Sequence, residues 1–203
     1  MFYPLTRNFV SNAKFYASVG IKDMFDAEDQ GAQTYNERDR FYFGNALDEI
    51  ARHLKRSRQP LFTMIFTMGT HSPYDTTYMP EVDVPGGGPG TDLEMSEYLR
   101  RLAMARIDYE ELRGEIARRF PGERFLIVHY GDHHPIATRS LLGFNDKLDA
   151  EDISLPLESL GFITYYAVEG INYQPPPLPE VETLDVPYIP LVILNAAGLS
   201  PAA

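Results

Sequence analysis

One apolar stretch that ends in a cluster of titratable side chains constrains this chain most. Its sequence is Phe125-Leu126-Ile127-Val128-His129-Tyr130-Gly131-Asp132-His133-His134-Pro135. Four consecutive apolar residues are typical of a buried strand, and the glycine turn and proline after them end it. Carboxylate oxygen and imidazole nitrogen are both ordinary ligands of zinc or manganese. Open α/β sheets hold their ligands just past the carboxyl ends of strands, so Asp132 and His133 are candidate metal ligands.

A second stretch has the same order of features. The apolar run Leu61–Met68 is followed by Gly69-Thr70-His71-Ser72-Pro73-Tyr74, and four of the five histidines of the chain lie in these two stretches. A single histidine is more often a capped or hydrogen-bonded turn residue than a functional one. An adjacent aspartate and histidine at a strand end are costly to bury unpaired, which favours a functional role for Asp132 and His133.

Composition excludes several classes of function. The chain has 203 residues, a net charge of −11 and no cysteine. The negative charge repels a nucleic-acid backbone, and without cysteine neither disulfides nor thiolate metal sites can form. No apolar run is long enough to span a bilayer and no signal peptide opens the chain, so we expect a soluble polypeptide. From the uncapped opening at residues 1–7 we expect a segment of a larger protein, with a native start at Met1 as the alternative.

Periodicity predicts alternating helices and strands over the whole length. We expect helices at residues 7–19, 39–55, 93–119 and 186–198, and strands at residues 21–25, 61–68, 125–128 and 162–168. This alternation favours an α/β layer architecture within a single domain, residues 1–203.

Four local expectations accompany these elements. Asp39 is a candidate N-cap of the helix at 39–55, and residues 26–29 read as a solvated acidic loop. Residues 74–91, rich in glycine and proline, are expected to form a surface loop that packs against nothing. The Glu- and Arg-bearing face of the helix at 93–119 is expected to be solvated.

The two stretches resemble the C-terminal part of the sulfatase-like branch of the alkaline phosphatase superfamily. Gly131-Asp132-His133 is similar to the late metal-binding Asp-His of that family, and Thr70-His71-Ser72-Pro73-Tyr74 to its substrate-site histidine followed by Pro-Tyr. Phe2-Tyr3 and residues 16–25 also resemble a segment that precedes this histidine. The nearest members are the membrane-anchored phosphoglycerol and phosphoethanolamine transferases and lipoteichoic acid synthase. The resemblance extends to about Arg139.

This resemblance implies a fold, a chemistry and roles for three residues. It implies a partial alkaline phosphatase-like sandwich, a mixed, mostly parallel sheet flanked by helices. It implies hydrolysis or transfer of phosphoric or sulfuric esters, with a lipid headgroup or a glycan as a possible substrate. Asp132 and His133 would bind a divalent metal (Zn, Mn, Mg or Ca), and His71 would bind the substrate phosphate or protonate the leaving alcohol. The whole parent would sit in the inner membrane, with this part periplasmic or extracellular.

The chain also departs from the family. There the nucleophile and the remaining metal ligands lie N-terminal to the residues seen here, and no candidate for them is found. We therefore expect a half-site that is inactive alone and binds metal weakly. Arg7 is a candidate anion-binding arginine, with a plain surface role as the alternative.

Two other interpretations stay open. The chain could be a non-catalytic α/β binding or assembly module that lacks a nucleophile. The string Asp132-His133-His134 also invites comparison with the DHH phosphoesterases, but that family needs further aspartate motifs near its N-terminus, and none is present.

Overall fold

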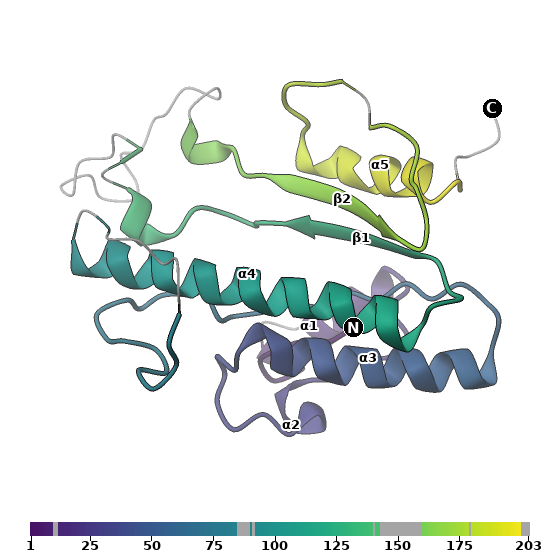
Figure 1. Ribbon diagram of the computed structural model, residues 1–203, viewed down its shortest axis with the longest axis horizontal. Helices are drawn as coiled ribbons and strands as arrows, with labels where there is room; N and C mark the ends of the chain where they lie inside the picture. Colours follow the sequence, from purple (N-terminus) through teal and green to yellow (C-terminus); the bar gives the residue numbers. More distant parts are fainter. Residues whose placement is uncertain are drawn as a thin grey trace. The chain divides into compact units, whose positions relative to one another are not determined.

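The computed structural model describes residues 1–9, 12–84, 90, 92–139, 141–142, 160–178 and 180–199 (Figure 1). The chain divides into two compact units, Met1–Glu115 and Ile116–Ala203, and each is described by itself. The helices that begin in the first unit are α1 (Asn12–Ser18), α2 (Ala27–Gln30), α3 (Asp39–Arg56) and α4 (Leu93–Arg119). The second unit contains β1 (Phe125–Tyr130), β2 (Tyr166–Ile171) and α5 (Ile189–Ala196), with short 3-10 turns between them.

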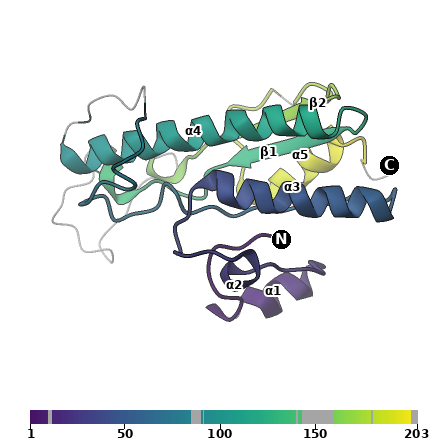
Figure 2. The same cartoon turned by 60° about the horizontal axis from the view of Figure 1, so that its bottom comes forward.

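Helices α3 and α4 are the long elements of the first unit and lie side by side in both views (Figures 1 and 2). The sequence predicted both of them, and the bounds of α4 are those expected. Tyr42, Ala46 and Leu47 of α3 are buried, as are Met104 and Leu112 of α4. Apolar residues at helical spacing therefore lie on the buried side of each helix.

The expected N-cap of α3 is wrong. Arg38 occupies the N-cap position and makes no capping hydrogen bond with its side chain, while Asp39 is the first residue of the helix. The Asp39 side chain turns inward and is buried. An aspartate near a helix start satisfies the sequence rule for a cap in either place, so the pattern alone does not separate the two positions.

The strands expected at residues 21–25 and 61–68 are also wrong. Phe2 forms single parallel bridges with Phe25 on one side and Ile65 on the other. Two hydrogen bonds accompany the second bridge, from Phe2 N to the Met64 carbonyl at 2.8 Å and from Phe66 N to the Phe2 carbonyl at 3.0 Å. The ladder cannot continue through Pro4, which has no backbone N–H to donate. Both segments are extended, but neither belongs to a sheet in the described structure.

The sheet of the second unit corrects the expected fold. β1 pairs with β2 in antiparallel orientation, with Val128 opposite Val168, and these two strands make up the sheet of the described residues. A mixed, mostly parallel sheet of the alkaline phosphatase type is not present there, so the expected fold class is wrong beyond its general α/β character. Apolar runs predict an extended, buried backbone, but they do not fix the partner or the direction of pairing.

Helix α5 and the turn after β2 complete the second unit. Val192 and Ala196 of α5 are buried, and the Tyr173 hydroxyl donates to the Ala196 carbonyl at 2.5 Å. A Cβ on Gly170 would lie 2.0 Å from the Tyr173 carbonyl oxygen, so only glycine fits where β2 meets this turn. Among the described residues, no helix combines the length and apolarity needed to cross a membrane.

Candidate functional site

Asp132 and His133 lie directly after β1 with their side chains paired. The distance from Asp132 Oδ2 to His133 Nε2 is 3.5 Å, and the two side chains are 60% and 67% exposed, respectively. The other carboxylate oxygen, Oδ1, accepts the His133 backbone N–H at 2.9 Å. One oxygen therefore fixes the turn and leaves the other beside the imidazole.

The opposite nitrogen of the His133 ring determines how this pair can act. His133 Nδ1 lies 3.0 Å from the His134 carbonyl oxygen. A carbonyl only accepts hydrogen bonds, so Nδ1 carries the proton, and in the neutral ring Nε2 presents a lone pair. Metal-binding histidines are commonly oriented by such a bond to a backbone carbonyl. Two ligand atoms about 2.1 Å from a tetrahedral metal lie about 3.4 Å apart, close to the observed separation.

The residues around this pair hold the turn. His134 Nε2 lies 2.6 Å from the Ile163 carbonyl, which gives His134 a structural partner. Gly131 N donates to the Tyr165 carbonyl at 3.2 Å, and a Cβ on Gly131 would lie 2.7 Å from Thr164 Oγ1. Glycine at this position therefore lets the turn pass close to the segment that enters β2.

His129, on β1, is exposed and has an aromatic neighbour. Burial lowers the pKa of His129, and its ring meets Tyr165 edge-on with a centroid distance of 5.8 Å. The neutral form is therefore favoured at physiological pH.

His71 lies in an ordered turn of the first unit. Its backbone N donates to the Met68 carbonyl at 3.0 Å, and its Nδ1 lies 2.7 Å from the Ser72 carbonyl. By the same argument Nδ1 carries the proton, and Nε2 is the nitrogen left for a substrate. The side chain is exposed.

Arg101 of α4 supports this turn from below the surface. It is 4% exposed, and its Nη1 donates to the His71 carbonyl at 2.7 Å. Its Nε donates to Glu97 at 2.7 Å, and its guanidinium lies over the Tyr74 and Tyr78 rings at 5.1 and 5.3 Å. The backbone around His71 is therefore fixed by a buried cation.

The segment that follows His71 is held by α4 as well. Arg100 donates to the carbonyls of Tyr78, Met79 and Val82, and Glu97 accepts the Tyr78 backbone N–H at 2.8 Å. The expectation of a surface loop that packs against nothing is wrong for residues 74–82. Residues 85–89 and 91, also part of that expectation, lie outside the described part of the chain.

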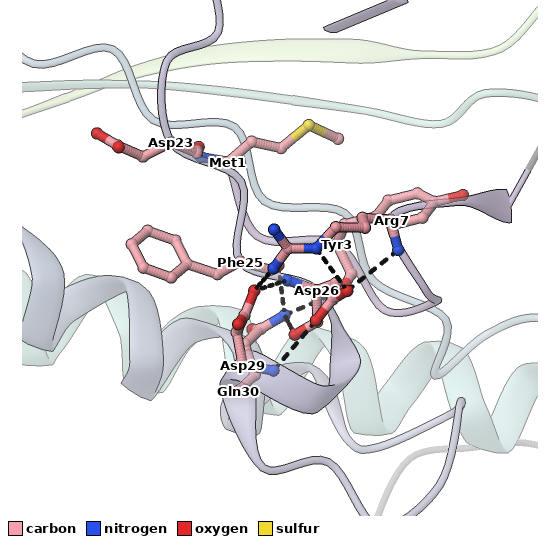
Figure 3. Close-up of polar contacts among 8 residues, drawn as sticks. All are labelled: Met1, Tyr3, Arg7, Asp23, Phe25, Asp26, Asp29 and Gln30. Carbon is pink, nitrogen blue, oxygen red and sulfur yellow. Dashed lines mark hydrogen bonds and ion pairs between the residues drawn. The ribbon is translucent and has the colours of Figure 1, made fainter. Parts of the chain in front are cut away.

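Arg7 is engaged by two carboxylates (Figure 3). Its backbone N and its Nε both donate to Asp26 Oδ2 at 3.1 Å, and its guanidinium also contacts Asp29. Asp26 and Asp29 form a reciprocal capping box at the start of α2, so the acidic loop expected at residues 26–29 is a capped helical turn. Burial alone would raise the pKa of Asp26, but hydrogen bonds from the Asp29 N–H and from Arg7 outweigh burial and lower it. The role of Arg7 in this structure is to hold α2.

The predicted site residues divide between the two units. His71 belongs to the first unit, and Asp132 and His133 belong to the second, so a pocket shared by all three stays a prediction. Only the Asp132–His133 pair is brought together by the structure. No cluster of three His, Cys, Asp or Glu side chains able to hold a metal occurs among the described residues.

The sequence interpretation missed the charged side chains inside α4. Glu97, Arg101 and Asp108 are all buried, although this face was expected to be solvated. Their spacing of four and then seven residues places them on the same helix face as the buried Met104 and Leu112. A charge that recurs in phase with the apolar stripe was therefore the signal available in the sequence.

Comparison with known proteins gives no match to any family model, curated protein or solved structure.

Proposed function

We propose that this chain supplies two ligands, Asp132 and His133, to the divalent-metal centre of a phosphoric or sulfuric ester hydrolase or transferase. The single observation that carries the proposal is the pairing of Asp132 Oδ2 with His133 Nε2 at 3.5 Å. With Nδ1 bonded to the His134 carbonyl, a carboxylate oxygen and an imidazole lone pair face each other. A divalent cation between them satisfies both groups.

The chemistry proposed for the centre is electrostatic. A bound metal would neutralise the non-bridging oxygens of a phosphate or sulfate ester and activate a nucleophile. In its doubly protonated form, His71 would contact the ester oxygens or protonate the leaving alcohol through Nε2–H, since its Nδ1–H is bonded to the Ser72 carbonyl. Arg101 would keep the His71 turn in place through the carbonyl contact.

Two ligands do not make a complete site, so the proposal includes residues from outside this chain. Zinc centres use at least three protein ligands, and no third candidate lies near the pair within the described residues. We propose that the nucleophile and the remaining ligands come from elsewhere in a longer protein. The chain alone should then show no turnover of p-nitrophenyl phosphate or p-nitrophenyl sulfate with Zn²⁺ or Mn²⁺ present.

A competition experiment tests the ligand assignment. The untagged protein competes with a chromogenic chelator for Zn²⁺, and the Asp132→Asn variant is compared with Asp75→Asn, which changes an exposed aspartate in the first unit. We expect Asp132→Asn to weaken Zn²⁺ binding about tenfold or more and Asp75→Asn to leave it unchanged. Identical curves for all three proteins would contradict the proposal and favour a non-catalytic α/β module.

A further inference from the structure

The carboxylate of Asp39 is buried inside the first unit, and one of its oxygens accepts no hydrogen bond from the described residues. The residue is 8% exposed, and within the described part of the chain its Oδ1 has no hydrogen-bond partner. The carboxylate borders a cavity of about 10 Å³, also lined by Arg38, Gly69, Tyr78, Arg101 and Asp108. A space of this size holds about one water molecule, which is too little to hydrate a carboxylate fully.

The cations that line the cavity are engaged with other groups. Arg38 donates from Nε to Asp108 Oδ2 at 3.1 Å. Arg101 donates to Glu97 and to the His71 carbonyl. Asp39 therefore has no ion-pair partner of its own among these two guanidiniums.

The remaining groups around Asp39 either stabilise or destabilise its charged carboxylate. The Thr67 hydroxyl and the Gly69 N–H stabilise the charged carboxylate by hydrogen bonding, and Arg38 does so through its charge. Asp108 opposes it. Tyr42 and Tyr78 also face this region; burial raises the pKa of both, and Glu37 adds to each shift, so both phenols are neutral at physiological pH. Burial is the largest effect on Asp39 and raises its pKa to about 6.

The groups that Asp39 contacts belong to the turn that carries His71. A Cβ on Gly69 would lie 2.8 Å from Asp39 Oδ1, so glycine allows the turn to close directly over the carboxylate. His71 N donates to the Met68 carbonyl within the same turn. Opening of residues 67–71 would therefore give water access to Asp39.

We propose that Asp39 is a proton-controlled latch on the turn formed by residues 67–71. The turn stays closed over the neutral carboxyl group and opens more often when the carboxyl group is charged, because opening lets water solvate the charge. This behaviour requires no metal and no role for His71. Only its consequence for activity, through the pH-dependent position of His71, rests on the proposed function.

Proton linkage gives the sign and size of the effect. In the closed turn the pKa of Asp39 is about 6, and in an open, solvated turn it returns to the ordinary value near 3.8. The closed turn thus binds the proton more tightly, and acid favours closure. Between pH 5 and pH 7.5 the opening equilibrium should increase about tenfold.

Amide hydrogen exchange tests the latch. Protection factors, which remove the intrinsic pH dependence of exchange, are measured for Gly69 and His71 at pH 5 and pH 7.5, with Ala46 of α3 as a reference for global unfolding. We expect protection of the two turn amides to fall about tenfold at the higher pH and to stay below that of Ala46. The Asp39→Asn variant should lose this pH dependence, and Asp75→Asn should keep it.

Three results would overturn the latch. These are a pH-independent turn in the wild type, an Asp39→Asn variant that keeps the pH dependence, and turn amides that exchange only with global unfolding. A second measurement covers an Asp39→Asn variant that does not fold. The Asp39 Cγ signal of the wild type should titrate with a midpoint near 6, and a midpoint below about 4.5 would contradict the latch. Neither measurement depends on metal binding at Asp132, so each proposal can fail without the other.

Discussion

The Arg101 guanidinium donates a hydrogen bond of 2.7 Å to the backbone carbonyl of His71, thirty residues earlier in the chain. The same guanidinium is bonded to Glu97 and covered by the rings of Tyr74 and Tyr78. A long-range, buried, charge-assisted contact of this kind fixes backbone more firmly than a neutral bond at the surface. The turn that presents His71 is therefore anchored in α4.

Replacing Arg101 tests this anchor. Arg101→Met removes the 2.7 Å contact to buried Glu97 and the donor to the His71 carbonyl. Glu97 keeps the longer contact of 3.7 Å with Arg100. We expect a loss of about 2 to 4 kcal/mol in the free energy of unfolding, measured by urea denaturation, together with a shifted His71 amide resonance.

The matched control is Arg106→Met on the same helix, where the side chain is exposed. It should change the free energy of unfolding by less than about 0.5 kcal/mol. Equal losses for the two variants would show that Arg101 does not anchor the turn.

Asp39 should make the protein less stable as the pH rises. Its pKa is about 6 in the folded state and near 3.8 when unfolded, so its stabilising contribution is complete below pH 3.8 and is lost as the pH rises through 6. The difference in unfolding free energy between Asp39→Asn and the wild type should therefore grow in favour of the variant between pH 4 and pH 7. This gain is at most about 3 kcal/mol, and denaturation series at both pH values measure it. A difference independent of pH would contradict the assignment.

Replacing each of two glycines with alanine should change the free energy of unfolding in opposite directions. In Gly170→Ala, the new Cβ would lie 2.0 Å from the Tyr173 carbonyl oxygen and 2.7 Å from Pro175 Cδ, so backbone must move. We expect a loss of about 2 kcal/mol or more in unfolding free energy. Gly114→Ala meets no atom within 4 Å and lies inside α4, so it should add about 0.5 to 1 kcal/mol. Thermal unfolding of both variants measures these changes in stability. A Gly170→Ala protein as stable as the wild type would contradict the close approach of Tyr173 to Gly170 in β2.

The long helices were the most predictable part of the fold. The apolar spacing of α3 and α4 extends over enough turns to define each helix from sequence. The apolar run at residues 125–128 likewise predicted β1. The expected strand at 162–168 begins later, at Tyr166, because residues 160–162 form a 3-10 turn. The local sequence pattern thus identifies the elements that carry a clear hydrophobic period of their own.

Pairing and buried charge were not predictable in the same way. The run at 61–68 is as apolar as β1, yet it pairs with Phe2 at a single bridge, and Phe62 is 68% exposed. Arg101 and Asp39 read as solvated or capping residues, and only their contacts with the His71 turn reveal another role. In the candidate site, Asp132 and His133 are adjacent in the sequence, but the carbonyl contact that orients the imidazole is visible only in the structure.

Paramagnetic broadening by Mn²⁺ tests the metal-ligand assignment most directly. Substoichiometric Mn²⁺ is added to the labelled, untagged chain, and the His133 imidazole and Asp132 amide signals are compared with those of His53. We expect selective broadening at Asp132 and His133 that disappears in Asp132→Asn and persists in Asp75→Asn. Because the net charge of −11 attracts cations everywhere, broadening spread evenly over exposed carboxylates, with His133 affected no more than His53, would contradict the assignment.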